Sequence, residues 1–416
     1  MKKKRGTLAL VSLGCAKNAV DLQVMAGNLL KEGWSLSPDP DCADVVIVNT
    51  CSFIASAREE AESEILRAIE LKKIGRYGKV VVAGCYPQRY PEAAENFPGV
   101  DEWIGVPDKW KYPAVPGLRF TGKAFAYLKI AEGCAHRCAY CAIPGIRGKY
   151  RSRPPEMILA EAQALLASGC RELNVIAQDP MLYGIDFKGP KRERPGLSDL
   201  LWALDDLPGD FWVRVLYSYP NEISGEFIDW MNESKHALKY IDVPLQHTVP
   251  EVLERMNRGK AVEASLAAAD TLRELVPDVT LRTTIMTGFP GETEARFRRL
   301  LADLRRMQFD HLGAFAFSPE KGTASYSMSG RPSRATAEKR EREVMELAAK
   351  IWEVKSARMI GGVYDALVVA PGVARMESQA PDVDGVVRIK GGEVGEFVKV
   401  KLVKVDGFDF RGKIVG

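Results

Sequence analysis

The sequence predicts an α/β protein of three domains: an N-terminal doubly wound parallel sheet, a central parallel β/α barrel that is complete or incomplete, and a small C-terminal antiparallel β-barrel. Three observations predict this. Short runs rich in valine and isoleucine alternate with helix-like segments over residues 1–115 and again over 123–359, as in parallel sheets. At 416 residues the chain is too long for one hydrophobic core. Over residues 360–416, alternating valines between glycines are typical of short antiparallel strands.

In the first domain, residues 1–115, each predicted strand runs directly into a cysteine. The strands are 7–13, 44–49 and 79–83, with helices predicted at 18–32 and 56–74. Cys15, Cys51 and Cys85 therefore stand at the carboxyl ends of their strands, which is the edge where open parallel sheets bind ligands. Three thiols at one edge predict an iron–sulfur cluster that keeps one iron open. The alternative is that they are small core residues.

A stretch rich in proline and glycine, 98–122, predicts a linker to the second domain, 123–359. Polar residues follow its predicted strands, as they do at the active-site rim of a parallel barrel. The predicted strands are 124–131, 172–177, 212–217, 237–243, 280–287 and 311–317. The predicted helices are 156–168, 197–204, 251–275, 294–306 and 332–359. We expect the last helix to pack on the barrel through Val344, Leu347, Ile351 and Val354.

A second group of three cysteines follows the first strand of the barrel. Cys134, Cys138 and Cys141 are spaced C-x3-C-x2-C. Thiolates usually hold a [4Fe–4S] cluster in fours, so three local ligands leave one iron open to a small molecule. The alternatives are a zinc site completed by His136 or three unrelated buried thiols, but zinc sites more often use C-x2-C pairs.

Composition excludes several classes of protein. The net charge is +3, from 58 basic and 55 acidic residues, so no strong overall field favours nucleic acid. Eight cysteines in so long a chain are too few for a disulfide scaffold. Cys42 and Cys170 follow no strand, and we expect neither to bind metal. We expect a cytoplasmic monomer without a membrane span.

The chain resembles the radical S-adenosylmethionine (SAM) methylthiotransferases along nearly its whole length. The matching motifs surround the six cysteines, with Lys17 and Asn18 after the first and Tyr140 before the last. Further matches run from Arg147 to Arg153, from Ile176 to Asp179, from Asp242 to His247 and from Gly288 to Thr293. The resemblance implies a barrel of the radical SAM type, a TRAM-like C-terminal domain that recruits substrate, two [4Fe–4S] clusters, SAM and an external electron donor.

The family resemblance also implies roles for the site residues, with no catalytic side chain beyond the cluster ligands. One SAM methylates a sulfide at the Cys15/Cys51/Cys85 cluster, and another is cleaved at the Cys134/Cys138/Cys141 cluster. The resulting radical takes a hydrogen from the substrate, which then receives the methylthio group. Cofactor contacts are expected from Tyr140, Gln178, Arg214, Gln246, Gly288 and Glu292. Arg214 has a structural ion pair as its alternative, and His247 is either a substrate contact or a hydrogen-bonded rim residue.

Two branches of the family differ in substrate. One modifies an adenosine in transfer RNA, and the other modifies the β-carbon of an aspartate in small-subunit ribosomal protein S12. Motifs at 14–18, 177–179 and 380–385 resemble the S12 branch, whereas Leu22-Gln23 and Pro180 depart from it. The C-terminal domain has no net charge, and its acidic 382–384 loop suits a basic protein loop. Besides the transfer-RNA branch, an alternative of another class is a non-catalytic iron–sulfur protein that senses redox state on ribosomes or RNA.

Overall fold

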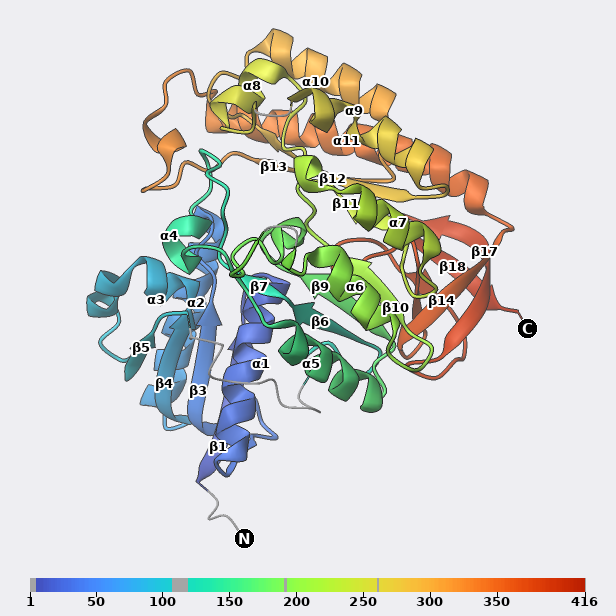
Figure 1. The fold of residues 1–416 in the computed structure, drawn as a ribbon. Coiled ribbons are helices and arrows are strands. Elements are labelled where there is room, and N and C mark those ends of the chain that lie inside the picture. Colours follow the sequence, from blue (N-terminus) through green and yellow to red (C-terminus); the bar gives the residue numbers. More distant parts are fainter. Residues whose placement is uncertain (1–4, 107–118, 191–192, 260–261, 416) are drawn as a thin grey trace.

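The computed structural model describes residues 5–106, 119–190, 193–259 and 262–415 of the chain. Figure 1 shows a blue N-terminal sheet, a green-to-orange central part and a red C-terminal barrel. The predicted α/β class and all six predicted strands of the central domain are present. Among the described helices, none is both long and apolar enough to cross a membrane.

The N-terminal sheet is parallel and doubly wound, with the strand order β2-β1-β3-β4-β5. Helix α1 packs on one face through Leu22, against Ile47 and Val81, while α2 packs on the other face through Ile65 and its apolar neighbours. The strands are β1 (Gly6–Ser12), β2 (Trp34–Leu36), β3 (Ala43–Thr50), β4 (Tyr77–Gly84) and β5 (Glu102–Ile104), and the helices are α1 (Ala16–Lys31), α2 (Ala55–Lys73) and α3 (Cys85–Arg89). Strand β5 lies inside the predicted linker, so that part of the linker prediction was wrong; residues 107–118 lie outside the described structure.

The central domain is an incomplete barrel of six parallel strands. Strands β6, β9 and β10 form one sheet and β11, β12 and β13 another, and a bridge between Val213 and Ala237 joins them. In the described structure the edge strands β6 and β13 do not pair with each other. The strands are β6 (Phe125–Lys129), β9 (Glu172–Ile176), β10 (Trp212–Val215), β11 (Tyr240–Asp242), β12 (Thr280–Thr287) and β13 (His311–Ala316), with a hairpin of β7 (Ala131–Glu132) and β8 (Arg151–Ser152).

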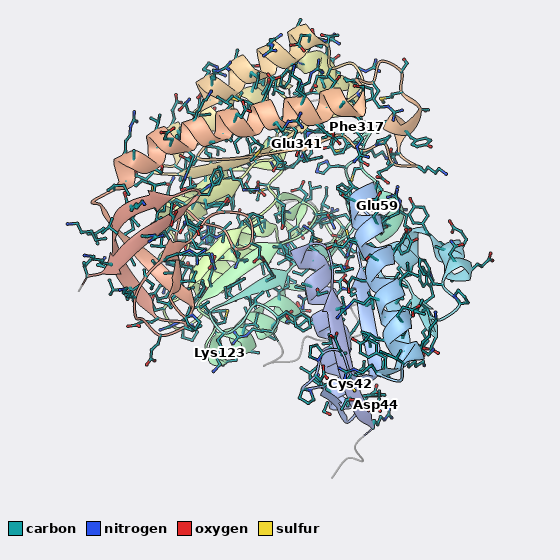
Figure 2. All side chains as sticks on the ribbon, turned by 180° about the vertical axis from the view of Figure 1, so that it is seen from behind. Cys42, Asp44, Glu59, Lys123, Phe317 and Glu341 are labelled. Carbon is teal, nitrogen blue, oxygen red and sulfur yellow. The ribbon has the colours of Figure 1, made fainter. Side chains whose placement is uncertain are left out.

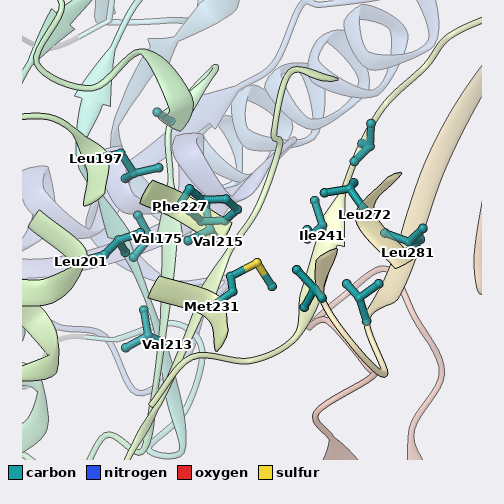
Figure 3. Packing of buried hydrophobic residues seen from close by; sticks show 14 of the residues in the cluster. Val175, Leu197, Leu201, Val213, Val215, Phe227, Met231, Ile241, Leu272 and Leu281 are labelled. Atoms are coloured by element: carbon teal, nitrogen blue, oxygen red, sulfur yellow. The ribbon is translucent and has the colours of Figure 1, made fainter. Parts of the chain in front are cut away.

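Helices cover the outside of this barrel. Figure 3 shows Val175, Val213 and Ile241 from the strands packed with Leu201, Phe227 and Leu272 from the helices. The helices are α4 (Ile143–Arg147), α5 (Pro155–Ala167), α6 (Leu197–Asp205), α7 (Gly225–Glu233), α8 (Pro250–Arg255), α9 (Val262–Leu275), α10 (Glu294–Met307) and α11 (Arg334–Met359). Helix α7 was not predicted from the sequence. The single helix predicted at 251–275 is divided after α8, where Asn257 adopts a left-handed φ of 56° that ends a helix.

Helix α11 packs on the barrel through Val344, Leu347 and Ile351, as predicted. Val354 is instead 53% exposed, so its assignment to the buried face was wrong. Further along the helix, Trp352 belongs to the core of the C-terminal domain. This one helix therefore joins the two domains.

The C-terminal barrel is closed in the order β14-β15-β16-β18-β17. Its strands are β14 (Val363–Ala370), β15 (Val373–Met376), β16 (Val387–Arg388), β17 (Phe397–Asp406) and β18 (Asp409–Ile414). The predicted small barrel is present, but β16 and β18 run parallel, so the barrel is not wholly antiparallel. Glycine is needed at position 385, because a Cβ there would lie 1.8 Å from the carbonyl oxygen of Phe408.

A loop of the C-terminal domain spans the open seam of the central barrel. Asp382 accepts a hydrogen bond of 2.5 Å from Tyr127 on the edge strand β6. Asp384 lies 3.4 Å from the ring of His311 on the opposite edge strand, β13, and 2.8 Å from the Arg282 guanidinium. The interpretation of 382–384 as a surface for a basic protein loop was therefore wrong for Asp384, whose side chain is 1% exposed and already paired, whereas Asp382 and Val383 are exposed.

Substituting Asp384 should destabilise the protein. Asp384→Ala removes the acceptor of Tyr240, Arg282 and the Ala380 N–H, and a buried ion pair that loses one partner typically costs roughly 3–5 kcal/mol. Thermal unfolding should show a clearly lower midpoint. The control Asp365→Ala removes an exposed pair with Lys399 and should change stability by less than about 1 kcal/mol. Equal midpoints for the two variants would contradict the bridging role of the loop.

Candidate functional site

Cys15, Cys51 and Cys85 lie at the carboxyl ends of three adjacent strands. Cys15 precedes α1, Cys51 follows β3 and Cys85 begins α3, directly after β4. In the sheet, β1, β3 and β4 are neighbours, and the strand order reverses direction between β1 and β3, where open sheets bind ligands. The loops touch, because a Cβ on Gly14 would lie 2.6 Å from the Cβ of Cys51. The tertiary structure thus brings this first triad together.

The three thiols differ in their electrostatic surroundings. Desolvation by the surrounding protein would raise the pKa of Cys15, which is still exposed to solvent, but the charges of Lys17 and Arg147 and a hydrogen bond from the Asn18 N–H together lower it. Burial raises the pKa of Cys51 to about 11 and also raises that of Cys85. Burial lowers the pKa of Lys17 itself. Cationic side chains that favour thiolates, beside thiols that are all free, form a donor set that suits a cluster.

A buried network of charged groups connects this first triad to the barrel. Arg147, at the end of α4, lies 3.3 Å from the sulfur of Cys85 and 3.0 Å from both Asp21 on α1 and Glu132 on β7. Lys129 on β6 lies 3.1 Å from the same Asp21 and 2.5 Å from Glu132. All four charged side chains are at most 5% exposed. Ion pairs this deeply buried fix the two domains in one relative position.

A second contact joins the same faces of the two domains. Glu320, which follows β13, lies 2.6 Å from Arg58 and 3.1 Å from Arg89. Arg89 also donates to the carbonyl of Ser52, the residue after Cys51. The carboxyl ends of the sheet and of the barrel therefore face each other, as two cooperating clusters require.

Cys134, Cys138 and Cys141 lie in the loop between β7 and α4, all partly exposed. The loop begins at Gly133, whose φ is 74° and where a Cβ would lie 2.1 Å from the carbonyl oxygen of Lys149; only glycine fits. Burial raises the pKa of Cys134 to about 11 and that of Cys141 to about 12. Arg258 lies 3.9 Å from the sulfur of Cys138, a cation beside the second triad.

His136 is held away from its neighbouring cysteines. Its Nε2 lies 2.5 Å from a carboxylate oxygen of Asp179, and its ring stacks on Tyr219 at 3.9 Å. Over the described residues, no three His, Cys, Asp or Glu side chains are grouped as ligands of a single metal ion. In a [4Fe–4S] cubane each thiolate binds a different iron, so the cysteine ligands of a cluster lie farther apart than the ligands of a single metal ion.

Three polar atoms at the strand ends are buried without a hydrogen-bond partner in the described structure. They are Gln178 Nε2 after β9, Ser218 Oγ after β10 and Gln246 Oε1 after β11. Buried polar groups are nearly always satisfied, so such exceptions at a rim suggest that a ligand supplies the missing partners. Tyr140, beside the second triad, packs in an apolar wall with Phe289 and Phe317. These residues fit a small polar molecule with an aromatic part, such as SAM.

The other sequence candidates are engaged elsewhere. The Gly288 N–H donates to Glu292, which is also bound by Arg340 at 2.8 Å and lies 3.2 Å from His247. His247 is thus a buried, hydrogen-bonded rim residue, and the Gly288 turn rests on α11, where a Cβ would lie 2.2 Å from Ala337. Arg214 pairs with Glu172 at 3.0 Å and with the Glu377 carbonyl of the C-terminal domain. The ion pair that was its structural alternative is present.

The remaining cysteines lie apart from both triads. Cys42 precedes β3, at the opposite end of that strand from Cys51, and Figure 2 shows it beside Asp44, far from Phe317. Cys170 is buried before β9.

Sequence reasoning missed Asp21, Lys129 and Glu132 as linking residues. The one available signal was a lysine inside an apolar strand, since a buried charge requires a partner.

The chain matches three families in succession. Residues 7–105 match the uncharacterized protein family UPF0004, residues 128–304 the radical SAM superfamily and residues 360–415 the TRAM domain. It is 37% identical over the full length of both chains to "Ribosomal protein uS12 methylthiotransferase RimO" of Geobacter sulfurreducens. It is 40% identical to the protein of the same name of Moorella thermoacetica, over 98% of this chain and 99% of that one. The chain belongs to the uS12 methylthiotransferase family.

Solved structures of other radical SAM enzymes share the fold. The methyltransferase TsrM of Kitasatospora setae, solved with cobalamin and a [4Fe-4S] cluster, superposes with a TM-score of 0.53 at 17% identity over 77% of each chain. The cobalamin-dependent SAM radical enzyme OxsB gives 0.52 at 13% identity, over 83% of this chain and 56% of that one. At such identities the likeness concerns the fold alone. Together with the family match over residues 128–304, this likeness confirms the predicted radical SAM fold of the central domain.

Arg147 should be the main support of the domain contact. Arg147→Met removes the cation shared by Asp21 and Glu132, and the loss of one partner from a buried network costs roughly 3–5 kcal/mol. Chemical denaturation should therefore show a less stable protein. The control Arg151→Met, at the exposed first position of β8, should stay within about 0.5 kcal/mol of the unmodified protein. Equal stability of both variants would show that the network does not join the domains.

Proposed function

We propose that this protein is a radical SAM methylthiotransferase that adds a methylthio group to the β-carbon of an aspartate in ribosomal protein S12 (uS12), using two [4Fe–4S] clusters and SAM. The observation that carries the proposal is the pair of cysteine triads, each at the carboxyl edge of its own parallel sheet, with the edges facing each other. Relatives aligned over 98–100% of this chain are named as uS12 methylthiotransferases. A single-cluster radical enzyme would not need the first triad.

The chain's own residues hold and orient the reactants. Cys15, Cys51 and Cys85 would hold the auxiliary cluster, and Cys134, Cys138 and Cys141 the SAM-binding cluster. The bound clusters and SAM supply the radical and sulfur chemistry that side-chain acids and bases cannot. Arg147 orients Cys85 and keeps the domains together. Arg258 places positive charge beside Cys138.

Other residues shape the space between the triads. Gln178, Ser218 and Gln246 point buried, unsatisfied polar atoms from the strand ends, and we assign them to SAM. Tyr140, Phe289 and Phe317 form an apolar wall, which keeps water away from reactive species. Gly288 and Glu292 are bonded to each other and, through Arg340, to α11, which supports this wall, and Arg214 serves the contact with the C-terminal domain.

Removing the first triad should separate the two roles. In a variant with Cys15, Cys51 and Cys85 all changed to alanine, anaerobic reconstitution should give about four iron atoms per chain instead of about eight. SAM should still be cleaved, because the second triad is intact, while methylthiolation of uS12 should be lost. Iron counting, a cleavage assay and mass spectrometry of uS12 measure the three outcomes. Loss of cleavage in this variant would contradict the division of labour.

Cys42→Ala and Cys170→Ala are the matched controls and should retain full iron and activity.

Mass spectrometry of uS12 and of bulk transfer RNA, from cells with and without the gene, distinguishes the two branches of the family. A methylthio group that disappears from transfer RNA instead of uS12 would overturn the proposal. If the protein with both clusters reconstituted cleaved no SAM, the alternative of a non-catalytic iron–sulfur protein would be favoured.

A further inference from the structure

Lys17 is a buried lysine whose ammonium group has no ion-pair partner in the described structure. It is 6% exposed and lies in the first turn of α1, two residues after Cys15. Its Nζ lies 3.5 Å from the centre of the Tyr217 ring. Lysines are almost never this buried unless they are paired, because taking an ammonium group out of water is costly. The interaction with one aromatic ring offsets only part of that cost.

Two of the neighbouring acids are engaged with other cations. Asp21 and Glu132 are each bonded to both Lys129 and Arg147. The third, Asp242 on β11, lies 3.7 Å from Arg282 on β12, beyond hydrogen-bond distance, and it attracts Lys17 less strongly than the thiol group of Cys15 does. Lys17 thus adds a positive charge to a cluster in which two cations already match two acids.

The position of Lys17 lies between the two halves of the site. On one side it is next to the first triad through Cys15. On the other side Tyr217 belongs to the segment that follows β10, and the next residue, Ser218, has a buried hydroxyl without a partner. A negatively charged group that enters between the sheet and the barrel would find an ammonium group there, desolvated and therefore strongly attractive.

We propose that Lys17 binds the carboxylate of the substrate aspartate and so places its β-carbon between the two cysteine triads. This inference rests on the proposed function. An aspartate β-carbon is one bond from its carboxylate carbon, so fixing the carboxylate also fixes the atom that reacts. Binding energy used in this way orients the substrate for reaction. A base in RNA has no carboxylate, and Lys17 therefore selects an acidic side chain over a nucleobase.

The test compares two substrates with two enzymes. The substrates are purified small ribosomal subunits that carry uS12 with either the target aspartate or asparagine at the same position. The unmodified enzyme should bind the aspartate form about 10- to 100-fold more tightly, the usual value of a hydrogen bond between charged groups. Lys17→Met should bind both forms equally weakly, and Lys17→Arg should recover part of the preference. Equilibrium binding measures the affinities, and mass spectrometry measures the methylthio group.

Lys31→Met, at the exposed last position of the same helix, is the control and should keep the preference. Equal binding of the two substrates by the unmodified enzyme would overturn the inference. This comparison needs no enzyme variant, so the inference can be tested even if the Lys17→Met protein fails to fold. An aspartate preference that survives in Lys17→Met would also overturn it. Absence of methylthiolation of uS12 by the unmodified enzyme would refute the proposed function instead, which keeps the two failures distinct.

Discussion

The structure depends on the buried network in which Arg147 and Lys129 share Asp21 and Glu132. Three of these residues belong to the barrel and one to α1 of the N-terminal sheet, so the network holds two separate folding units face to face. Buried charges without partners are costly, and the relative position of the domains is therefore strongly constrained. Each sheet carries its cysteines at its carboxyl edge. The same constraint therefore brings the two triads together into one site.

The incomplete barrel explains the arrangement of the outer domains. Six strands leave a seam between β6 and β13, which the 382–384 loop spans by bonding to both edge strands. Helix α1 also packs on the barrel, through Val20 and Val24 against Tyr127, Ile176 and Tyr240. A closed barrel would have no room for these contacts. The C-terminal domain therefore contributes to the stability of the barrel.

Three buried side chains without hydrogen-bond partners lie where the barrel strands end. Gln178, Ser218 and Gln246 have no such partner in the described structure, and Lys17 has no ion-pair partner there, although most other buried charges are paired. Folding alone gains nothing from such groups, because each has given up its hydration. Other unsatisfied atoms, such as Trp230 Nε1 and Gln379 Nε2, lie elsewhere, so it is the position of these groups that indicates a site for bound molecules, with neutral donors and acceptors on the barrel side and a cation beside the first triad.

The sequence alone determined the α/β class, the two triads and the family, because each depends on local patterns: strand periodicity, cysteine spacing and strand-end position. It also placed Gln178 and Gln246 at the rim. Only the tertiary structure decided that Arg214 and Glu292 are engaged internally, that Asp384 closes a seam and that Lys17 is left unpaired. Those outcomes depend on partners more than forty residues away in the chain, such as Glu172 for Arg214 and Arg340 for Glu292. Whether a charged side chain is satisfied is a property of its neighbours in space, which no local pattern contains.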